Sequence, residues 1–135
     1  MNLNKNTLVG YLRRKKLIGK NEVVYDMRQI GDGQKNQIYV ATTAKQRLIV
    51  KQAHSKVQIK ERWWLDRKRA QTEHACLEVL ANILPPIVIP KALGEDRTDF
   101  VLVTTAMAKE AVVWETDLAR GRVDLQIAAQ AGELL

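Results

Sequence analysis

The sequence predicts an α+β fold in which a five-stranded antiparallel sheet packs against helices. Three strand-like apolar runs separated by short polar turns occupy residues 23–53, and a helical pattern follows at 66–84. Two more strand-like runs then flank a turn at 96–99. The connections within each group are short, which favours antiparallel pairing because parallel strands need a long crossover.

The first three strands are expected at 23–30, 37–42 and 47–53, joined by turns at 31–36 and 43–46. Side chains alternate along a strand, so Ile49, Lys51 and Ala53 share one face of the third strand. Lys51 therefore emerges between two apolar neighbours, where an ammonium needs an anionic partner. A lysine that simply extends its head group to the surface is the alternative.

The helix expected at 66–84 has a carboxylate on its apolar side. Asp66 is a suitable N-cap, and Pro85 ends the pattern. At about 100° per residue, Glu73 falls within the stripe of Ala70 and Leu77 that we expect to face the sheet. A carboxylate on a packing face is costly unless it is paired. Lys51 on the neighbouring strand is its expected partner.

The remaining segments follow from the same signals. A short helix is expected to start at Asn6-Thr7, and the basic run at 13–16 after it is interpreted as a solvated face. A hairpin is expected from 91–95 and 100–105, then a loop through Trp114, then a helix over 124–135. That last helix ends without a cap and with its apolar side uncovered, so we expect the chain to be cut from a longer protein.

Composition narrows the class of protein. The 135 residues have a net charge of +7, and residues 1–20 hold six basic side chains and no acidic one. A basic N-terminal half of this kind is typical of binding to nucleic acid, to a membrane surface or to ligand phosphates. No apolar run approaches the length of about 20 residues that spans a bilayer, and no signal peptide begins the chain. With Cys76 as the single cysteine, a cytoplasmic protein that does not bind membranes is expected.

The order of these pieces resembles the N-terminal lobe of protein kinases, in which a glycine turn precedes a strand lysine and an inward-facing helix glutamate. The turn here is Gly31-x-Gly33-x-x-Asn36, so the third glycine of that pattern is absent. The amino-acid sequence is more specifically similar to methylthioribose kinases and the aminoglycoside phosphotransferase family, over roughly residues 23–135. The similar segments are IGDGQKNQIYV at 30–40, LIVKQA at 48–53, Asp66, Arg67, Arg69, Glu73, Leu77, VVWE at 112–115, Leu118, GRVD at 121–124 and AAQAGELL at 128–135.

This resemblance implies a protein-kinase-like N-lobe with a helix C, truncated after the hinge linker. Its parts would be a basic helical segment at 1–22, the nucleotide-binding lobe at 23–107, and the hinge linker with the start of a C-lobe at 108–135. The implied ligand is ATP, with Lys51 on its phosphates and Glu73 as the partner of that lysine. The other implied ATP-binding residues are Gly31, Asp32, Gly33, Asn36, Ile49, Thr105, Ala106 and Met107. The family's catalytic loop and its metal-binding aspartate have no counterpart here, so Mg²⁺ ligands are expected in the missing C-lobe.

Two functions are weighed. The first is the ATP-binding lobe of a small-molecule kinase, whose whole enzyme transfers the ATP γ-phosphate to a hydroxyl of a sugar-like or aminoglycoside-like substrate bound through the missing lobe. The second is a non-catalytic kinase-like module that binds a partner protein or nucleic acid. Whether this chain alone is an enzyme stays open.

Three further features of the sequence bear on nucleic-acid binding, metal binding and self-association. Trp63-Trp64 lie among basic residues, as in a single-strand stacking surface, but such tryptophans more often pack on the adjoining helix, so nucleic acid is not expected. His74 and Cys76 do not share one helix face, so no metal site is expected. The uncovered C-terminal helix favours self-association.

Overall fold

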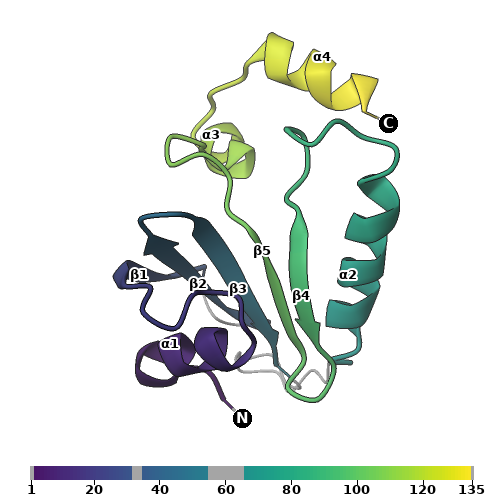
Figure 1. Cartoon of the computed structure of the whole chain (residues 1–135). Coiled ribbons are helices and arrows are strands. Elements are labelled where there is room, and N and C mark those ends of the chain that lie inside the picture. The colour runs from purple at the N-terminus through teal and green to yellow at the C-terminus, as the bar shows by residue number, and fades with distance from the viewer. Residues whose placement is uncertain (1, 32–34, 55–65, 135) are drawn as a thin grey trace, which may run out of the picture.

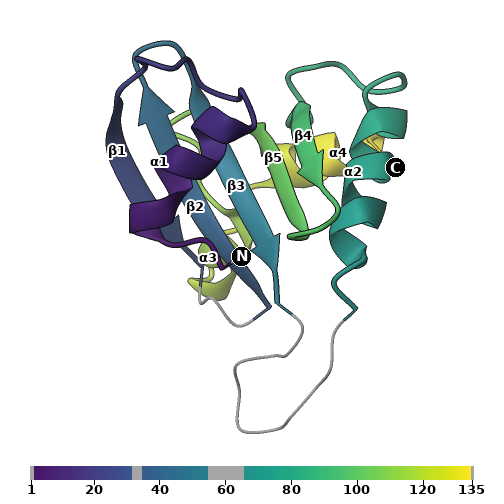
Figure 2. The same cartoon turned by 60° about the horizontal axis from the view of Figure 1, so that its bottom comes forward.

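Five antiparallel strands form one open sheet in the order β1-β2-β3-β5-β4 (Figures 1 and 2). The computed structural model describes residues 2–31, 35–54 and 66–134. The strands are β1 (Val24–Ile30), β2 (Asn36–Thr43), β3 (Arg47–Ala53), β4 (Ala92–Asp96) and β5 (Val101–Thr105). Within the described residues the helices are α1 (Lys5–Arg14), α2 (Arg69–Leu80), α3 (Trp114–Ala119) and α4 (Leu125–Glu133). The predicted α+β class and the five-stranded antiparallel sheet are confirmed.

Strand β3 lies inside the sheet, between β2 and β5, and is hydrogen-bonded on both sides. Lys51 stands opposite Ile38 of β2 and Leu102 of β5. A strand paired along both edges has little freedom to move, so the backbone that carries Lys51 is rigid.

Helix α1 covers one face of the sheet (Figure 2), and the hydrophobic core lies on that face. Leu48 and Val50, which the alternation of β3 directs away from Lys51, are fully buried there. They pack with apolar residues of α1 and of neighbouring strands, including Leu8, Leu12, Tyr39, Ala41, Val101 and Val103. The segment before β1 thus closes one face of the sheet and leaves the Lys51 face to the other elements.

Helix α1 begins two residues earlier than the sequence predicted. Asn4 is its N-cap: the Asn4 side chain accepts from the backbone N–H groups of Asn6 and Thr7, and the Thr7 hydroxyl accepts from the Asn4 N–H. This reciprocal pair needs polar side chains three residues apart, a spacing that Asn4 and Thr7 provide.

The basic run at the end of α1, residues 13–16, is only partly a solvated face. Arg13 and Lys16 are exposed, but the Lys15 Nζ lies 2.8 Å from the buried Asp96 carboxylate. Lys15 therefore joins the end of α1 to the end of β4, and is not free for a nucleic-acid contact.

Helix α2 is shorter than predicted and begins without a side-chain cap. Lys68 is its N-cap residue, whereas the Asp66 carboxylate accepts from the Lys68 N–H at 2.8 Å in the turn before the helix. Ala70 is buried, and Glu73 and Leu77 are half-buried, so the predicted inward face is correct. Cys76, interpreted as a packing residue, is exposed.

The final segment is more helical than the sequence indicated. Residues expected to form a loop through Trp114 form the short helix α3, because Glu115 and Asp117 place negative charge in its first turn. Asp124 caps α4 by accepting from the Gln126 and Ile127 N–H groups. Figure 1 shows α3 and α4 beyond one end of the sheet.

Candidate functional site

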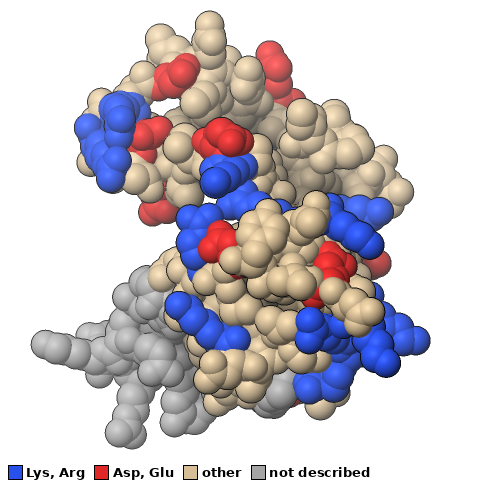
Figure 3. Space-filling view, turned by 60° about the vertical axis from the view of Figure 1, so that its left-hand side comes forward, with Lys and Arg blue, Asp and Glu red and all other residues tan. Residues whose placement is uncertain are grey.

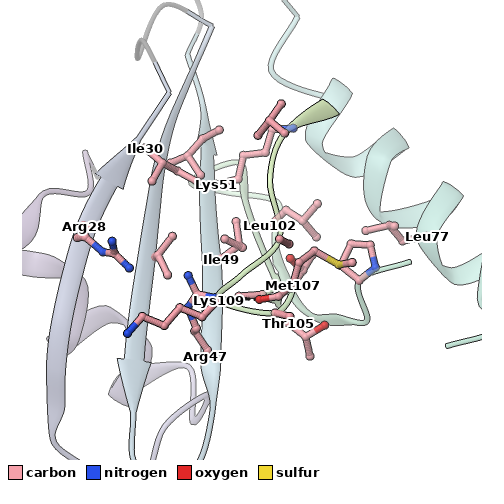
Figure 4. A pocket seen from close by; sticks show the side chains of 18 of the residues that line it. Arg28, Ile30, Arg47, Ile49, Lys51, Leu77, Leu102, Thr105, Met107 and Lys109 are labelled. Atoms are coloured by element: carbon pink, nitrogen blue, oxygen red, sulfur yellow. Dashed lines mark hydrogen bonds between the residues drawn. The ribbon is translucent and has the colours of Figure 1, made fainter. Parts of the chain in front are cut away.

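A cleft of about 510 Å³ opens on the sheet face opposite α1 (Figure 4). Its volume falls within the roughly 300–1,000 Å³ of small-molecule sites. The floor is formed by side chains of β1, β2, β3 and β5, and the walls by α2 and the segment after β5. The floor and wall residues include Ile30, Ile38, Val40, Ile49, Leu102, Thr104, Glu73, Leu77, Thr105, Ala106 and Met107.

Lys51 and Glu73 meet at this cleft as the sequence predicted. The Lys51 Nζ donates to the Glu73 Oε2 at 2.6 Å. Their side chains are 26% and 40% exposed, so water screens the pair and its net stabilisation is on the order of 0–1 kcal/mol. The ammonium has three N–H donors, and Glu73 accepts from one of them. Lys51 can therefore hold an anionic ligand without giving up its partner.

The middle of the cleft is an apolar surface. Ile38 and Ile49 come from adjacent strands, and Leu102 comes from β5 on the other side of β3. All three line the cleft, and Figure 4 shows the Ile49 and Leu102 side chains beside that of Lys51. An apolar surface next to an ammonium suits a ligand with an apolar ring and an anionic tail.

The backbone that follows β5, including Ala106 and Met107, forms one wall of the cleft. The Ala106 N–H donates to the Arg47 carbonyl at 2.8 Å, and the Arg47 Nη1 donates to the Met107 carbonyl at 2.9 Å. Arg47 therefore holds this wall in place and already occupies one of its carbonyl oxygens. The sequence signals did not single out Arg47, because its role depends on the pairing of β3 with β5.

The cleft is also more basic than the sequence indicated. Arg28, Arg47 and Lys109 line it together with Lys51, and Glu73 is the only acid among the described residues that do so. Figure 3 shows Lys and Arg side chains gathered along the hollow between the sheet and the α3 region. A hollow lined by charges of one sign concentrates its field and attracts anionic ligands.

The glycine turn is described only at its ends. Gly31 has a φ of +74°, which favours glycine because a side chain there would be strained. Asn36 starts β2, and its Oδ1 accepts from the Arg69 Nη2 at 3.1 Å, so its side chain holds α2 and does not line the cleft. Asp32 and Gly33, like Trp63 and Trp64, lie outside the described residues.

No group of three His, Cys, Asp or Glu side chains that could hold a metal occurs in the described part of the chain. His74 Nδ1 lies 3.7 Å from a Glu78 oxygen and 3.9 Å from a Glu95 oxygen. His54 comes directly after β3. Burial and the Arg69 guanidinium lower its pKa, which favours the neutral imidazole. The two histidines and Cys76 therefore form no joint site.

No family model matches the sequence, and no curated protein matches it. Among residues 2–31, 35–54 and 66–134, no helix is long and apolar enough to cross a bilayer. What the cleft binds must therefore follow from its own side chains and from the order of the elements that carry them.

Proposed function

We propose that this chain is the ATP-binding lobe of a small-molecule kinase with a protein-kinase-like fold, acting in the cytoplasm. The whole enzyme would transfer the ATP γ-phosphate to a hydroxyl of a small sugar-like or aminoglycoside-like substrate. One observation supports this most: a strand lysine, paired with an inward helix glutamate, stands at one end of an apolar cleft of nucleotide size. That combination is the phosphate-positioning device of kinases.

The residues present fit a nucleotide. Ile49 and Leu102 offer an apolar floor on which a base could lie, beside the backbone of Ala106 and Met107. Lys51 has donors left for phosphate oxygens, and the excess of positive charge along the cleft favours a polyanion. Gly31, at the start of the glycine turn, has a positive φ that favours glycine.

The cleft does not provide the rest of a phosphoryl-transfer site. Glu73 is engaged by Lys51, and the described lining contains no second carboxylate for Mg²⁺ or for activating a hydroxyl. The proposal therefore assigns the metal ligands, the base and the acceptor site to a second lobe. The 135-residue chain alone should transfer no phosphate from radiolabelled ATP to a panel of sugars and aminoglycosides. If the chain did transfer phosphate, and if Lys51→Ala abolished that transfer, this division of roles between two lobes would be contradicted.

Nucleotide binding is tested by titrating the chain with a fluorescent mant-ATP and displacing it with unlabelled ATP. Lys51→Ala should weaken binding by about ten- to a hundredfold, because each lost contact between a charged donor and phosphate is worth about 1.5–3 kcal/mol. Lys45→Ala removes the same charge from an exposed turn and should leave affinity unchanged. Equal affinity of the Lys51→Ala and wild-type chains would overturn the assignment.

A non-catalytic binding module is the second candidate. It is favoured by the apolar side chains that α4 and the residues before it expose, including Val123 and Leu125. Exposed apolar surface of this kind is typical of a docking face. A chain that bound no nucleotide but associated through this face would support the module.

A further inference from the structure

Helix α2 has few contacts that could fix its position. Ala70 is its one fully buried residue, and its N-cap Lys68 makes no side-chain hydrogen bond. The ion pair between Lys51 and Glu73 is too exposed to hold a helix by itself. Helix α2 also lies against β3, β4 and β5. A further interaction at its start would help to keep the Glu73 carboxylate beside the Lys51 ammonium.

Arg69, the first residue of α2, makes such an interaction. Its Nη1 donates to the carbonyls of His54 at 3.0 Å and Asp66 at 2.8 Å. Its Nη2 donates to the Lys35 carbonyl at 2.5 Å, the Asn36 Oδ1 at 3.1 Å and the His54 carbonyl at 3.0 Å. One guanidinium thus joins the end of the glycine turn, the residue after β3 and the start of α2.

These contacts give α2 a second connection to the β3 segment, about one helical turn before the Lys51–Glu73 pair. Arg69 precedes Glu73 by four residues, which is about one helical turn, so both side chains leave the same face of α2. His54 follows Lys51 by three residues and comes directly after β3. Two ties between one strand and one helix restrict rotation as well as translation of the helix, which a single exposed ion pair cannot do.

The far end of this cluster is fixed to the sheet. Asn36 pairs with Ala53 in the β2–β3 ladder, and the His54 N–H donates to the Lys35 carbonyl at 3.1 Å. Arg69 therefore bonds to backbone that is already ordered by the sheet. Its head group is partly removed from water there, and this burial lowers its pKa without neutralising so strong a base.

We propose that Arg69 is a positioning residue that joins the end of the glycine turn to α2 and thereby keeps Glu73 within reach of Lys51. Its effect on nucleotide binding rests on the proposed function, but the positioning is a property of the ligand-free chain. A planar, forked group is required, since a lysine ammonium at this position could not reach four acceptors in three segments.

The test measures the ion pair directly, without nucleotide. A carbodiimide joins a lysine and a carboxylate that are in contact, and mass spectrometry of the digested full chain quantifies the amide between residues 51 and 73. Arg69→Gln should lower this yield about threefold or more, because α2 loses its second tie. Arg67→Gln is the matched control: it removes the same charge two residues earlier, where Arg67 lies over the Phe100 ring at 4.2 Å, and should keep the wild-type yield.

Asn36→Ala provides an independent variant that leaves the charge unchanged. It removes one acceptor at the glycine turn and should lower the same yield, by less than Arg69→Gln does. If near-ultraviolet circular dichroism shows that Arg69→Gln does not fold, the cross-linking yield of Asn36→Ala tests the inference in its place. A wild-type yield in every folded variant of Arg69 and Asn36 would overturn the inference.

Nucleotide affinity separates this inference from the proposed function. Arg69→Gln should weaken mant-ATP binding several-fold, and Arg69→Lys should not restore it. If the wild-type chain bound no nucleotide, the proposed function would fail, whereas the cross-linking contrast between Arg69→Gln and Arg67→Gln would still show whether Arg69 positions Glu73.

Discussion

The Tyr11 hydroxyl lies 3.2 Å from an oxygen of the Asp96 carboxylate and donates to it, which ties α1 to the end of β4 across 85 residues of sequence. The same carboxylate accepts from the Thr98 and Asp99 N–H groups and pairs with Lys15. Asp96 thus organises the β4–β5 turn and holds the helix that covers the core. Because α1 closes the face behind Lys51, this cluster supports the cleft from the opposite side of the sheet.

Removing the Tyr11 hydroxyl should weaken that tie. Tyr11→Phe keeps the ring in the core but leaves Asp96 with one partner fewer, so we expect the free energy of unfolding to fall by about 1–2 kcal/mol. Urea unfolding monitored by tryptophan fluorescence measures the change. Tyr25→Phe is the matched control, because Tyr25 is 67% exposed and its hydroxyl should contribute nothing measurable. Equal losses in both variants would contradict the role given to the Tyr11–Asp96 bond.

Stability should fall at acid pH through Asp96. Burial favours the neutral acid, but Lys15 and the Asp99 and Thr98 N–H groups outweigh it, so the net pKa of Asp96 is lowered. A carboxyl with a lowered folded-state pKa binds protons more readily in the unfolded chain. Its contribution is therefore complete above its ordinary pKa of about 4 and is lost as the pH falls through the folded-state value.

Asp96→Asn provides the measurement of that contribution. Urea unfolding at pH values from 7 down to 3 should show a smaller decline for the variant than for the wild type, although the variant starts from a lower stability at pH 7. Parallel curves for the two chains would assign the acid sensitivity to other groups.

The pair between Lys51 and Glu73 should matter for binding more than for folding. Because both side chains are partly exposed, Glu73→Gln should change the free energy of unfolding by no more than about 1 kcal/mol. A fully buried pair would instead cost about 3–5 kcal/mol when one partner is removed. Thermal unfolding and mant-ATP titration of the same variant separate the effects: we expect a small shift in melting and a several-fold loss of affinity. A large loss of stability with unchanged affinity would indicate a purely structural pair.

Helix α4 should promote self-association. Leu125 is 79% exposed, and Ile127 and Leu134 are also exposed, so the helix presents apolar side chains to solvent. Light scattering should give a mass that rises with concentration for the full chain and stays monomeric for a chain ending at Gly121. Ile127→Lys should act like the truncation, whereas Gln126→Lys, which adds the same charge to the neighbouring exposed position, should not. Monomeric behaviour of the full chain at all concentrations would oppose this prediction.

Local patterns in the sequence were enough to predict most of the framework. Alternation in residues 47–53 correctly separated Lys51 from the buried Leu48 and Val50, because side chains on a strand must take opposite faces. The 3.6-residue period placed Glu73 toward the sheet for a similar reason, since helix geometry assigns each residue an angle before any packing is known. The helical composition of residues 124–135 likewise predicted a helix there, and α4 occupies Leu125–Glu133.

What only the tertiary structure decided involves partners far apart in the chain. Lys15 belongs to a run of basic residues that looks solvated, and only the approach of α1 to β4 provides its carboxylate. Asn36 fitted the glycine turn as a ligand-binding residue, yet its side chain meets Arg69 from 33 residues away. Arg47 and Arg69 act through backbone carbonyls, which every residue has, so no pattern of side chains could reveal those contacts. Propensity and periodicity are local properties, whereas these contacts arise from sheet pairing and helix docking.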